Sequence, residues 1–115
     1  MTIIIYHNSR CSKSRETLKL IEGRGLKPKA VDYLKTPPSA AELKTILKKL
    51  GLKPRELLRK GEPRYAELGL KDRQLDDDAL IALMVANPIL IERPIVVAGG
   101  KAAIGRPPET VLEIL

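Results

Sequence analysis

Cysteine, histidine and large aromatic residues are almost absent from this sequence of 115 residues. Cys11 is the sole cysteine and His7 the sole histidine, so the chain cannot form an internal disulfide or supply the four Cys and His ligands of a structural zinc site. It has no Trp, no Phe and only three Tyr, which is too few rings for the stacking platforms that bind single-stranded nucleic acid. These absences exclude disulfide and zinc scaffolds and disfavour nucleic-acid binding.

Long apolar runs are also missing. No stretch is long enough to cross a bilayer, and the N-terminal residues lack the basic, apolar and small-residue order of a secretory signal. We therefore expect no membrane association and a cytoplasmic, reducing location.

The residues that are present suffice for a folded protein. Hydrophobic residues make up 43% and charged residues 30%, and the length suits one domain over residues 1–115 with an aliphatic core. The apolar residues are mostly used by the expected core faces, so we expect a monomer. The net charge of +7 suits an anionic partner, although solubility alone would also explain it.

The first third of the chain predicts a βαβ unit. Residues 2–6 form a β-branched run typical of a buried strand, and apolar residues after Cys11 indicate a helix that Gly23 and Gly25 end. Residues 30–34 alternate enough to form a second strand, which a helical crossover makes parallel to the first.

A helical block is expected next. Ser39 and Glu42 form a capping-box pattern that opens a helix over residues 40–50, and Gly51 ends it. A short helical piece is expected over residues 54–59. Residues 76–78, all Asp, suit the cap of a helix that continues to about residue 86, and no histidine or further acidic residues are spaced around them to make a metal site.

The last part of the chain predicts a hairpin and a helix. Residues 94–98 and 101–104 are strands joined by Gly99 and Gly100, and a final helix begins at residues 107–108 and carries Val111, Leu112 and Leu115. The order βαβ, helical insertion over about residues 38–87, then ββα gives an α/β, thioredoxin-like mixed sheet.

Cys11 is the main candidate for chemistry. It lies where the first strand turns into a helix, and helix N-terminal amides favour a thiolate. Arg10, Lys13, Arg15 and His7 are close in sequence and add positive charge. The alternative is a buried structural thiol, which is common for free cysteine.

The segment lacks a second thiol. Ser14 stands where a C-x-x-C motif has its second cysteine, so Cys11 cannot form an internal disulfide with it. If Cys11 forms a covalent adduct, the resolving thiol must come from glutathione or a protein partner.

Three arginines lie at the ends of expected elements: Arg59, Arg93 and Arg106. Guanidinium groups bind tetrahedral oxyanions through paired hydrogen bonds, although each arginine taken alone is more often a solvated surface charge.

The segment from Tyr6 to Leu18 resembles the nucleophile segment of the glutaredoxin-coupled arsenate reductases. The likeness continues in order and spacing through residues 57–60, 67–70, 87–97 and 105–107. It implies a thioredoxin-like fold with a helical insertion, and neither a bound metal nor a bound organic cofactor.

The resemblance also implies an activity. Cys11 would attack arsenate to form a covalent adduct, glutathione would act as co-substrate and reduce it, and glutaredoxin would clear the mixed disulfide as arsenite leaves. Arg59, Arg93 and Arg106 match the arginines that hold the oxyanion. His7 matches a histidine that helps to keep the cysteine ionised, Ser14 and Arg15 are in supporting positions, and Pro94 matches a cis proline.

The chain departs from the family pattern in the loop itself, with Ser9 before the cysteine and Ser12 and Lys13 after it, and these positions bear on substrate choice and rate. Two other functions fit the same fold. One is a regulator that binds RNA polymerase. Such regulators often carry a C-x-x-C motif, which this chain lacks. The other is a general glutathione-dependent thiol oxidoreductase.

Overall fold

A computed structural model describes residues 2–115, and they form two compact units. The first combines residues 2–36 with residues 93–115, and the second is the intervening segment, Pro37–Glu92. The helical insertion is thus continuous in sequence, and the single domain over residues 1–115 stays a prediction.

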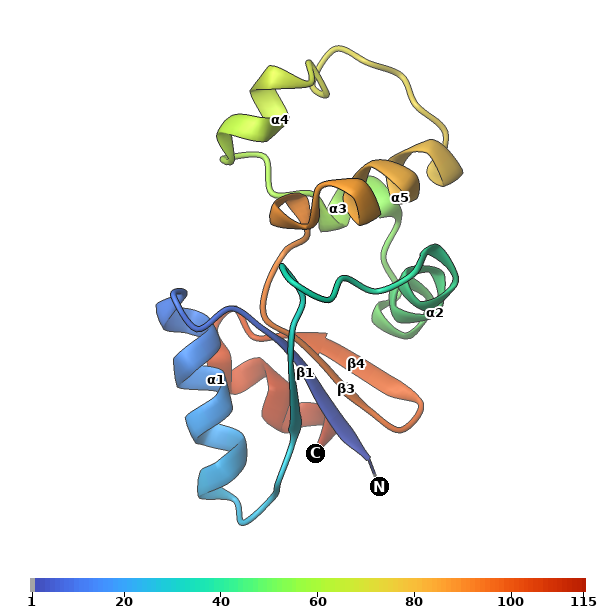
Figure 1. Ribbon diagram of the computed structural model, residues 1–115. Coiled ribbons are helices and arrows are strands. Elements are labelled where there is room, and N and C mark those ends of the chain that lie inside the picture. The colour runs from blue at the N-terminus through green and yellow to red at the C-terminus, as the bar shows by residue number, and fades with distance from the viewer. Residues whose placement is uncertain (1) are drawn as a thin grey trace. The chain divides into compact units, whose positions relative to one another are not determined.

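The first unit contains a four-stranded mixed sheet with the order β2-β1-β3-β4 (Figure 1). β1 (Ile3–His7) pairs in parallel with β2 (Lys29–Asp32) and antiparallel with β3 (Ile95–Ala98). β4 (Lys101–Ile104) pairs antiparallel with β3 across the turn at Gly99, whose φ of 62° requires glycine. The βαβ crossover and the hairpin are confirmed.

Two helices lie side by side in this unit (Figure 1). α1 (Ser12–Gly23) follows β1, and η2 (Pro108–Ile114) contacts both α1 and β4. Alternate residues of β1 and β3 point to the same side of the sheet and pack with one residue from each helix, because side chains alternate along a strand. The buried cluster consists of Ile3, Ile5, Val96, Ala98, Ile21 and Val111. This aliphatic core packs α1 and η2 against one side of the sheet.

The second unit is helical. Its elements are α2 (Ala40–Leu50), α3 (Pro54–Leu57), α4 (Pro63–Glu67), α5 (Asp77–Ala86) and η1 (Pro88–Leu90). α5 contacts α2, α3 and η1, and the buried side chains here include Leu43, Leu57, Leu80, Met84 and Leu90. None of the helices within residues 2–115 combines the length and the apolar character needed to cross a membrane.

The capping predictions for this unit are confirmed. Ser39 Oγ accepts a hydrogen bond from the Glu42 amide at 3.1 Å, and a Glu42 carboxylate oxygen accepts one from the Ser39 amide at 3.1 Å. Asp76 caps α5 by accepting from the Ala79 amide at 2.8 Å. Both helices therefore begin where the sequence predicts.

Several boundaries were wrong. The first strand is shifted by one residue and includes His7, and the second strand ends at Asp32, because the Asp32 carbonyl accepts from the amides of Lys35 and Thr36 and so turns the chain. The short helical piece ends at residue 57, and the final helix is a 3₁₀ helix. α4 and η1, both of which begin at a proline, were not predicted.

Candidate active site

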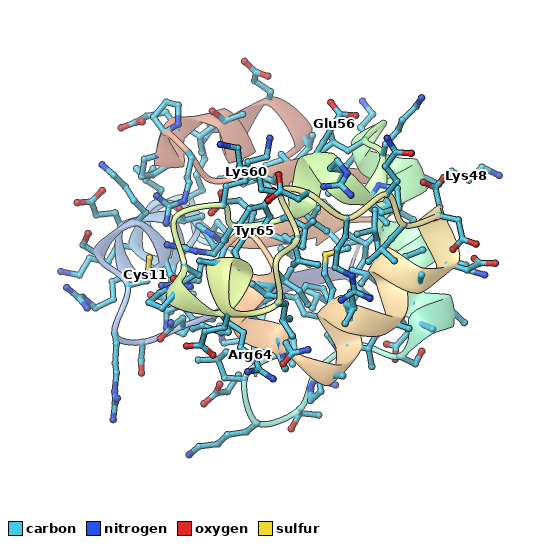
Figure 2. All side chains as sticks on the ribbon, turned by 90° about the horizontal axis from the view of Figure 1, so that it is seen from above. Cys11, Lys48, Glu56, Lys60, Arg64 and Tyr65 are labelled. Carbon is cyan, nitrogen blue, oxygen red and sulfur yellow. The ribbon has the colours of Figure 1, made fainter. Side chains whose placement is uncertain are left out.

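Cys11 is the N-cap residue of α1 (Figure 2). The turn after β1 is held by the Cys11 amide, which donates to the Asn8 carbonyl at 3.0 Å, and the Cys11 carbonyl accepts from the Arg15 amide at 3.0 Å to begin the helix. The Arg10 amide donates to the Asn8 side chain at 3.0 Å. The thiol is only partly buried, so a small molecule can reach it.

Opposing effects act on the Cys11 thiol. Burial, the strongest single influence, raises its pKa, but the amide N–H groups of Ser14 and Lys13 at the start of α1 and the guanidinium of Arg93 together lower the pKa below its ordinary value. The net effect favours the thiolate, the nucleophilic form of cysteine. The expected helix-terminus effect is therefore present, and a second contribution comes from the distant Arg93.

Arg106 also reaches the sulfur. Its Nη2 lies 3.6 Å from Cys11 Sγ, while its Nε donates to the Arg93 carbonyl at 2.7 Å. The backbone bond fixes the guanidinium plane, so that one edge is anchored and the other faces the thiol. Two of the three predicted arginines, Arg93 and Arg106, thus converge on Cys11 within the first unit.

Both arginines precede a proline. The peptide bonds Arg93-Pro94 and Arg106-Pro107 are cis, and the first of these agrees with the expectation for Pro94. The amide of Gly105 donates to the Pro94 carbonyl at 2.9 Å, which ties the chain before Arg106 to the chain after Arg93.

Tyr33 is a neighbour of Arg93 that the sequence did not reveal. Its side chain is only 1% exposed and interacts with the Arg93 guanidinium. Burial acts to lower the pKa of Arg93, but the charge interaction with Tyr33 and the contacts with Cys11 and Tyr33 outweigh it, so the pKa is raised. Arg93 therefore stays protonated beside the thiol.

His7 contacts Ser14, which is fully buried. His7 Nδ1 lies 2.5 Å from Ser14 Oγ, and the same oxygen accepts from the buried Asn8 amide at 3.0 Å. The Ser14 amide also donates a hydrogen bond to the Cys11 sulfur, so this network joins the end of β1 to the N-terminus of α1. His7 is thus connected to the thiol through Ser14.

The ionisation of His7 is altered by this position. Burial lowers its pKa below 6.5, the charge of Asp32 acts to raise it, and the charge of Arg15 lowers it further. Asp32 is the register partner of His7 on the neighbouring strand. The net effect favours the neutral imidazole near pH 7.

Arg15 holds the loop rather than the sulfur. Its Nη1 donates to the Ser9 carbonyl at 2.9 Å, and its side chain is exposed. The guanidinium group of Arg15 is therefore hydrogen-bonded to the backbone of the turn.

Arg59 belongs to the second unit. Its guanidinium lies 3.2 Å from Glu62 and 3.4 Å from Glu92, and its side chain is 21% exposed. Its amide donates to the Leu90 carbonyl at 2.8 Å, next to the isolated bridge between Leu58 and Ile91. Arg59 is thus ordered by two carboxylates and the backbone of its own unit.

Metal ligands are not gathered anywhere in residues 2–115, where no group of three or more His, Cys, Asp or Glu side chains could hold a metal ion.

A family model described as the ArsC family matches residues 6–114, which is almost the whole chain. The chain belongs to the ArsC family. The matched segment runs from the end of β1, through Cys11 and the insertion, to η2. The family resemblance inferred from the nucleophile segment is confirmed.

Two proteins of known sequence are similar to this chain over nearly their whole lengths. The uncharacterized protein YfgD of Escherichia coli (strain K12) is 60% identical over 112 residues, covering 96% of this chain and 94% of that protein. An arsenate reductase of Neisseria meningitidis is 51% identical over 114 residues, covering 98% of this chain and 97% of that enzyme.

A solved structure, the arsenate reductase from Vibrio cholerae, superposes with a TM-score of 0.96 at 56% identity and covers 100% of this chain and 98% of that one. The predicted α/β, thioredoxin-like fold class is therefore confirmed for this ArsC chain.

Proposed function

We propose that this ArsC protein is an arsenate reductase that reduces arsenate to arsenite through a covalent adduct on Cys11. The convergence of Arg93 and Arg106 on a thiol of lowered pKa carries the proposal. The arsenate reductases of similar sequence and full-length coverage support it.

The first step uses the site as described. Arg93 and Arg106 bind the arsenate oxygens, because two guanidinium groups beside one thiolate form a positively charged cradle for a tetrahedral anion. The Cys11 thiolate attacks arsenic, a sulfur–arsenic bond forms and one oxygen leaves as water after protonation. The same arginines stabilise the negative charge that develops on the remaining oxygens.

The electrons come from thiols. Glutathione reduces the adduct as co-substrate, and glutaredoxin removes glutathione from the resulting mixed disulfide. Arsenic gains two electrons and leaves as arsenite, while two thiols are oxidised to one disulfide. An external thiol is required because Cys11 is the only cysteine of the chain. This dependence also favours the reducing cytoplasm as the place where the protein works.

The remaining predicted residues have supporting roles in the proposal. His7 and Ser14 position the amides that face the sulfur, and Arg15 holds the turn through the Ser9 carbonyl. Arg59 is the third oxyanion arginine by family resemblance. Its guanidinium has five N–H donors, so it retains donors for an anion while Glu62 and Glu92 hold it.

The test is NADPH consumption in an assay coupled through glutathione, glutaredoxin and glutathione reductase, with and without arsenate. We expect arsenate-dependent turnover for the wild type and none for Cys11→Ser. Arg106→Ala should lose about 100-fold in kcat/KM, as expected when one oxyanion donor is removed. Arg24→Ala, at the far end of α1, serves as the matched control.

Two outcomes would contradict the proposal. Near wild-type turnover by Cys11→Ser would exclude Cys11 as the nucleophile. Absence of arsenate dependence, while the coupling system works with a control enzyme, would exclude arsenate. Glutathionylation of Cys11 that arsenate does not stimulate would then identify a general thiol oxidoreductase.

A further inference from the structure

A hollow of about 230 Å³ lies beside the nucleophile segment in the first unit. We call it the β1–β2 hollow, because it is lined by the last residue of β2 and by residues that follow the two parallel strands: Asp32, Asn8, Ser9, Arg10, Leu34 and Lys35. Crevices outside the carboxyl ends of parallel strands are frequent ligand sites. The mechanism above gives no ligand to this hollow.

The hollow adjoins Cys11. Arg10 is the residue before Cys11, and Asn8 accepts the hydrogen bond of the Cys11 amide. Arg93 and Arg106, by contrast, come from the ends of β3 and β4, which lie on the other side of β1 in the sheet order. A second ligand in the hollow would therefore be close to the sulfur without using the arginines that face it.

The charges of the hollow are unusual. Arg10 and Lys35 are exposed, and within residues 2–115 neither side chain takes part in an ion pair or a hydrogen bond. Asp32 supplies one carboxylate, whose Oδ1 accepts from the Leu34 amide at 3.2 Å. The hollow thus offers two cations and one anion to a ligand.

Leu34 adds an apolar contact. It is 38% exposed and is the one exposed large hydrophobic residue found within residues 2–115. The turn set by Asp32 places it on the wall of the hollow, where a ligand would shield it from water.

We propose that the β1–β2 hollow binds glutathione. This inference rests on the proposed function, which requires an external thiol at Cys11. Glutathione carries two carboxylates and one ammonium group, the complement of Arg10, Lys35 and Asp32. Its carboxylates bind Arg10 and Lys35, its ammonium group binds Asp32, and its thiol faces Cys11. The hollow thereby selects a small charged peptide thiol over an uncharged thiol.

Binding can be tested without any reaction. S-methylglutathione has no free thiol, so its addition to ¹⁵N-labelled protein without arsenate reports binding alone. We expect amide shifts concentrated in residues 8–10 and 32–35. Shifts confined to other residues, or no shifts at millimolar concentration, would overturn the proposal.

A pair of charge reversals tests the chemistry. Lys35→Glu should raise the KM for glutathione about five- to tenfold, because an attractive charge pair becomes repulsive. The kcat at saturating glutathione and the KM for arsenate should not change. Lys101→Glu makes the same change of net charge at the opposite end of the sheet, and an equal effect of both variants would contradict a specific site.

The two proposals can fail separately. If S-methylglutathione shifts the hollow residues and Lys35→Glu weakens this binding, the hollow is supported even when no arsenate is reduced. If arsenate is reduced with glutathione but the hollow residues do not respond, the hollow is excluded and the proposed function stands.

Discussion

The acidity of Cys11 depends on residues that are remote from one another in sequence. The amides of Lys13 and Ser14 act through the start of α1, whereas Arg93 acts from the segment that precedes β3. The Arg106 side chain is held beside Arg93, because it donates a hydrogen bond to the Arg93 carbonyl. The thiol is thus activated by a local helix effect and by a tertiary contact together.

We predict that Arg93→Ala raises the pKa of Cys11, because the variant loses the hydrogen bond and the positive charge that favour the thiolate. Only the thiolate is alkylated, so the rate of reaction with iodoacetamide rises with pH through the pKa of the thiol. The profile of the variant should therefore lie at higher pH than that of the wild type, whose pKa is lowered.

Arg24→Ala is the control for this profile. Arg24 is the C-cap of α1, and its substitution removes the same charge at the other end of the helix. If both variants keep the wild-type profile, the amides of α1 alone explain the acidity of Cys11.

The residues of the site were only partly predictable. Cys11 follows from a local pattern of strand, turn and helix. The pairing of Arg59 with Glu92 and of Arg93 with Tyr33 joins residues far apart in sequence, and no local spacing indicates such contacts. The spacing predicts that Arg15 favours the thiolate, whereas in the structure its guanidinium donates to the Ser9 carbonyl.

Among the elements, the end of β4 approaches α1 and Pro94 unusually closely. A Cβ atom at Gly105 would lie 2.4 Å from Thr17 Oγ1 and 2.9 Å from Pro94 Cγ. Thr17 is fully buried, and its hydroxyl is already bound to the Lys13 carbonyl at 2.7 Å. Glycine at this position allows Arg106, the next residue, to approach Cys11.

We predict that Gly105→Ala lowers the free energy of unfolding by about 1–3 kcal/mol through overpacking. It should also reduce arsenate turnover, because the backbone before Arg106 must move. Urea denaturation measures the first effect and the coupled assay the second. Gly100→Ala, whose Cβ would meet nothing within 4 Å, is the matched control. Equal stability of the two variants would contradict this account.

Elements were predicted well where their signals are local. The capping box of Ser39 and Glu42 located the start of α2, because both partners lie within one helical turn. β2 was extended too far, since the apolar pattern of Tyr33 and Leu34 outweighed the turn made by Asp32. η2 is a 3₁₀ helix whose packing against α1 and β4 no sequence period reveals.

The whole molecule consists of two units, each with buried apolar residues of its own. The chain leaves the first unit after residue 36 and returns to it at residue 93. The first unit needs segments from both sides of the insertion. Its complete sheet therefore cannot form until residues 93–115 have come together with the strands before residue 37.

We predict that the chain unfolds as one domain, in a single cooperative transition. Met84 in α5 is fully buried, so Met84→Ala should cost about 2–5 kcal/mol. Residue-resolved NMR in urea should then show that the urea concentration at the midpoint of unfolding falls equally for residues 37–92 and for residues 93–115. Ala82→Ser, exposed on the same helix, should leave the midpoints in place.

Lowering of the midpoint in residues 37–92 alone would contradict a single domain and would identify the insertion as an independently unfolding part.

The two edge strands of the sheet have a consequence for self-association. β2 and β4 have four residues each, and each begins with an exposed lysine, Lys29 or Lys101. A short edge that carries a charge is a poor template for a further strand, because a neighbouring copy would bring its own lysine to the same place. Both edges of the sheet therefore disfavour the addition of a strand from a second copy of the chain.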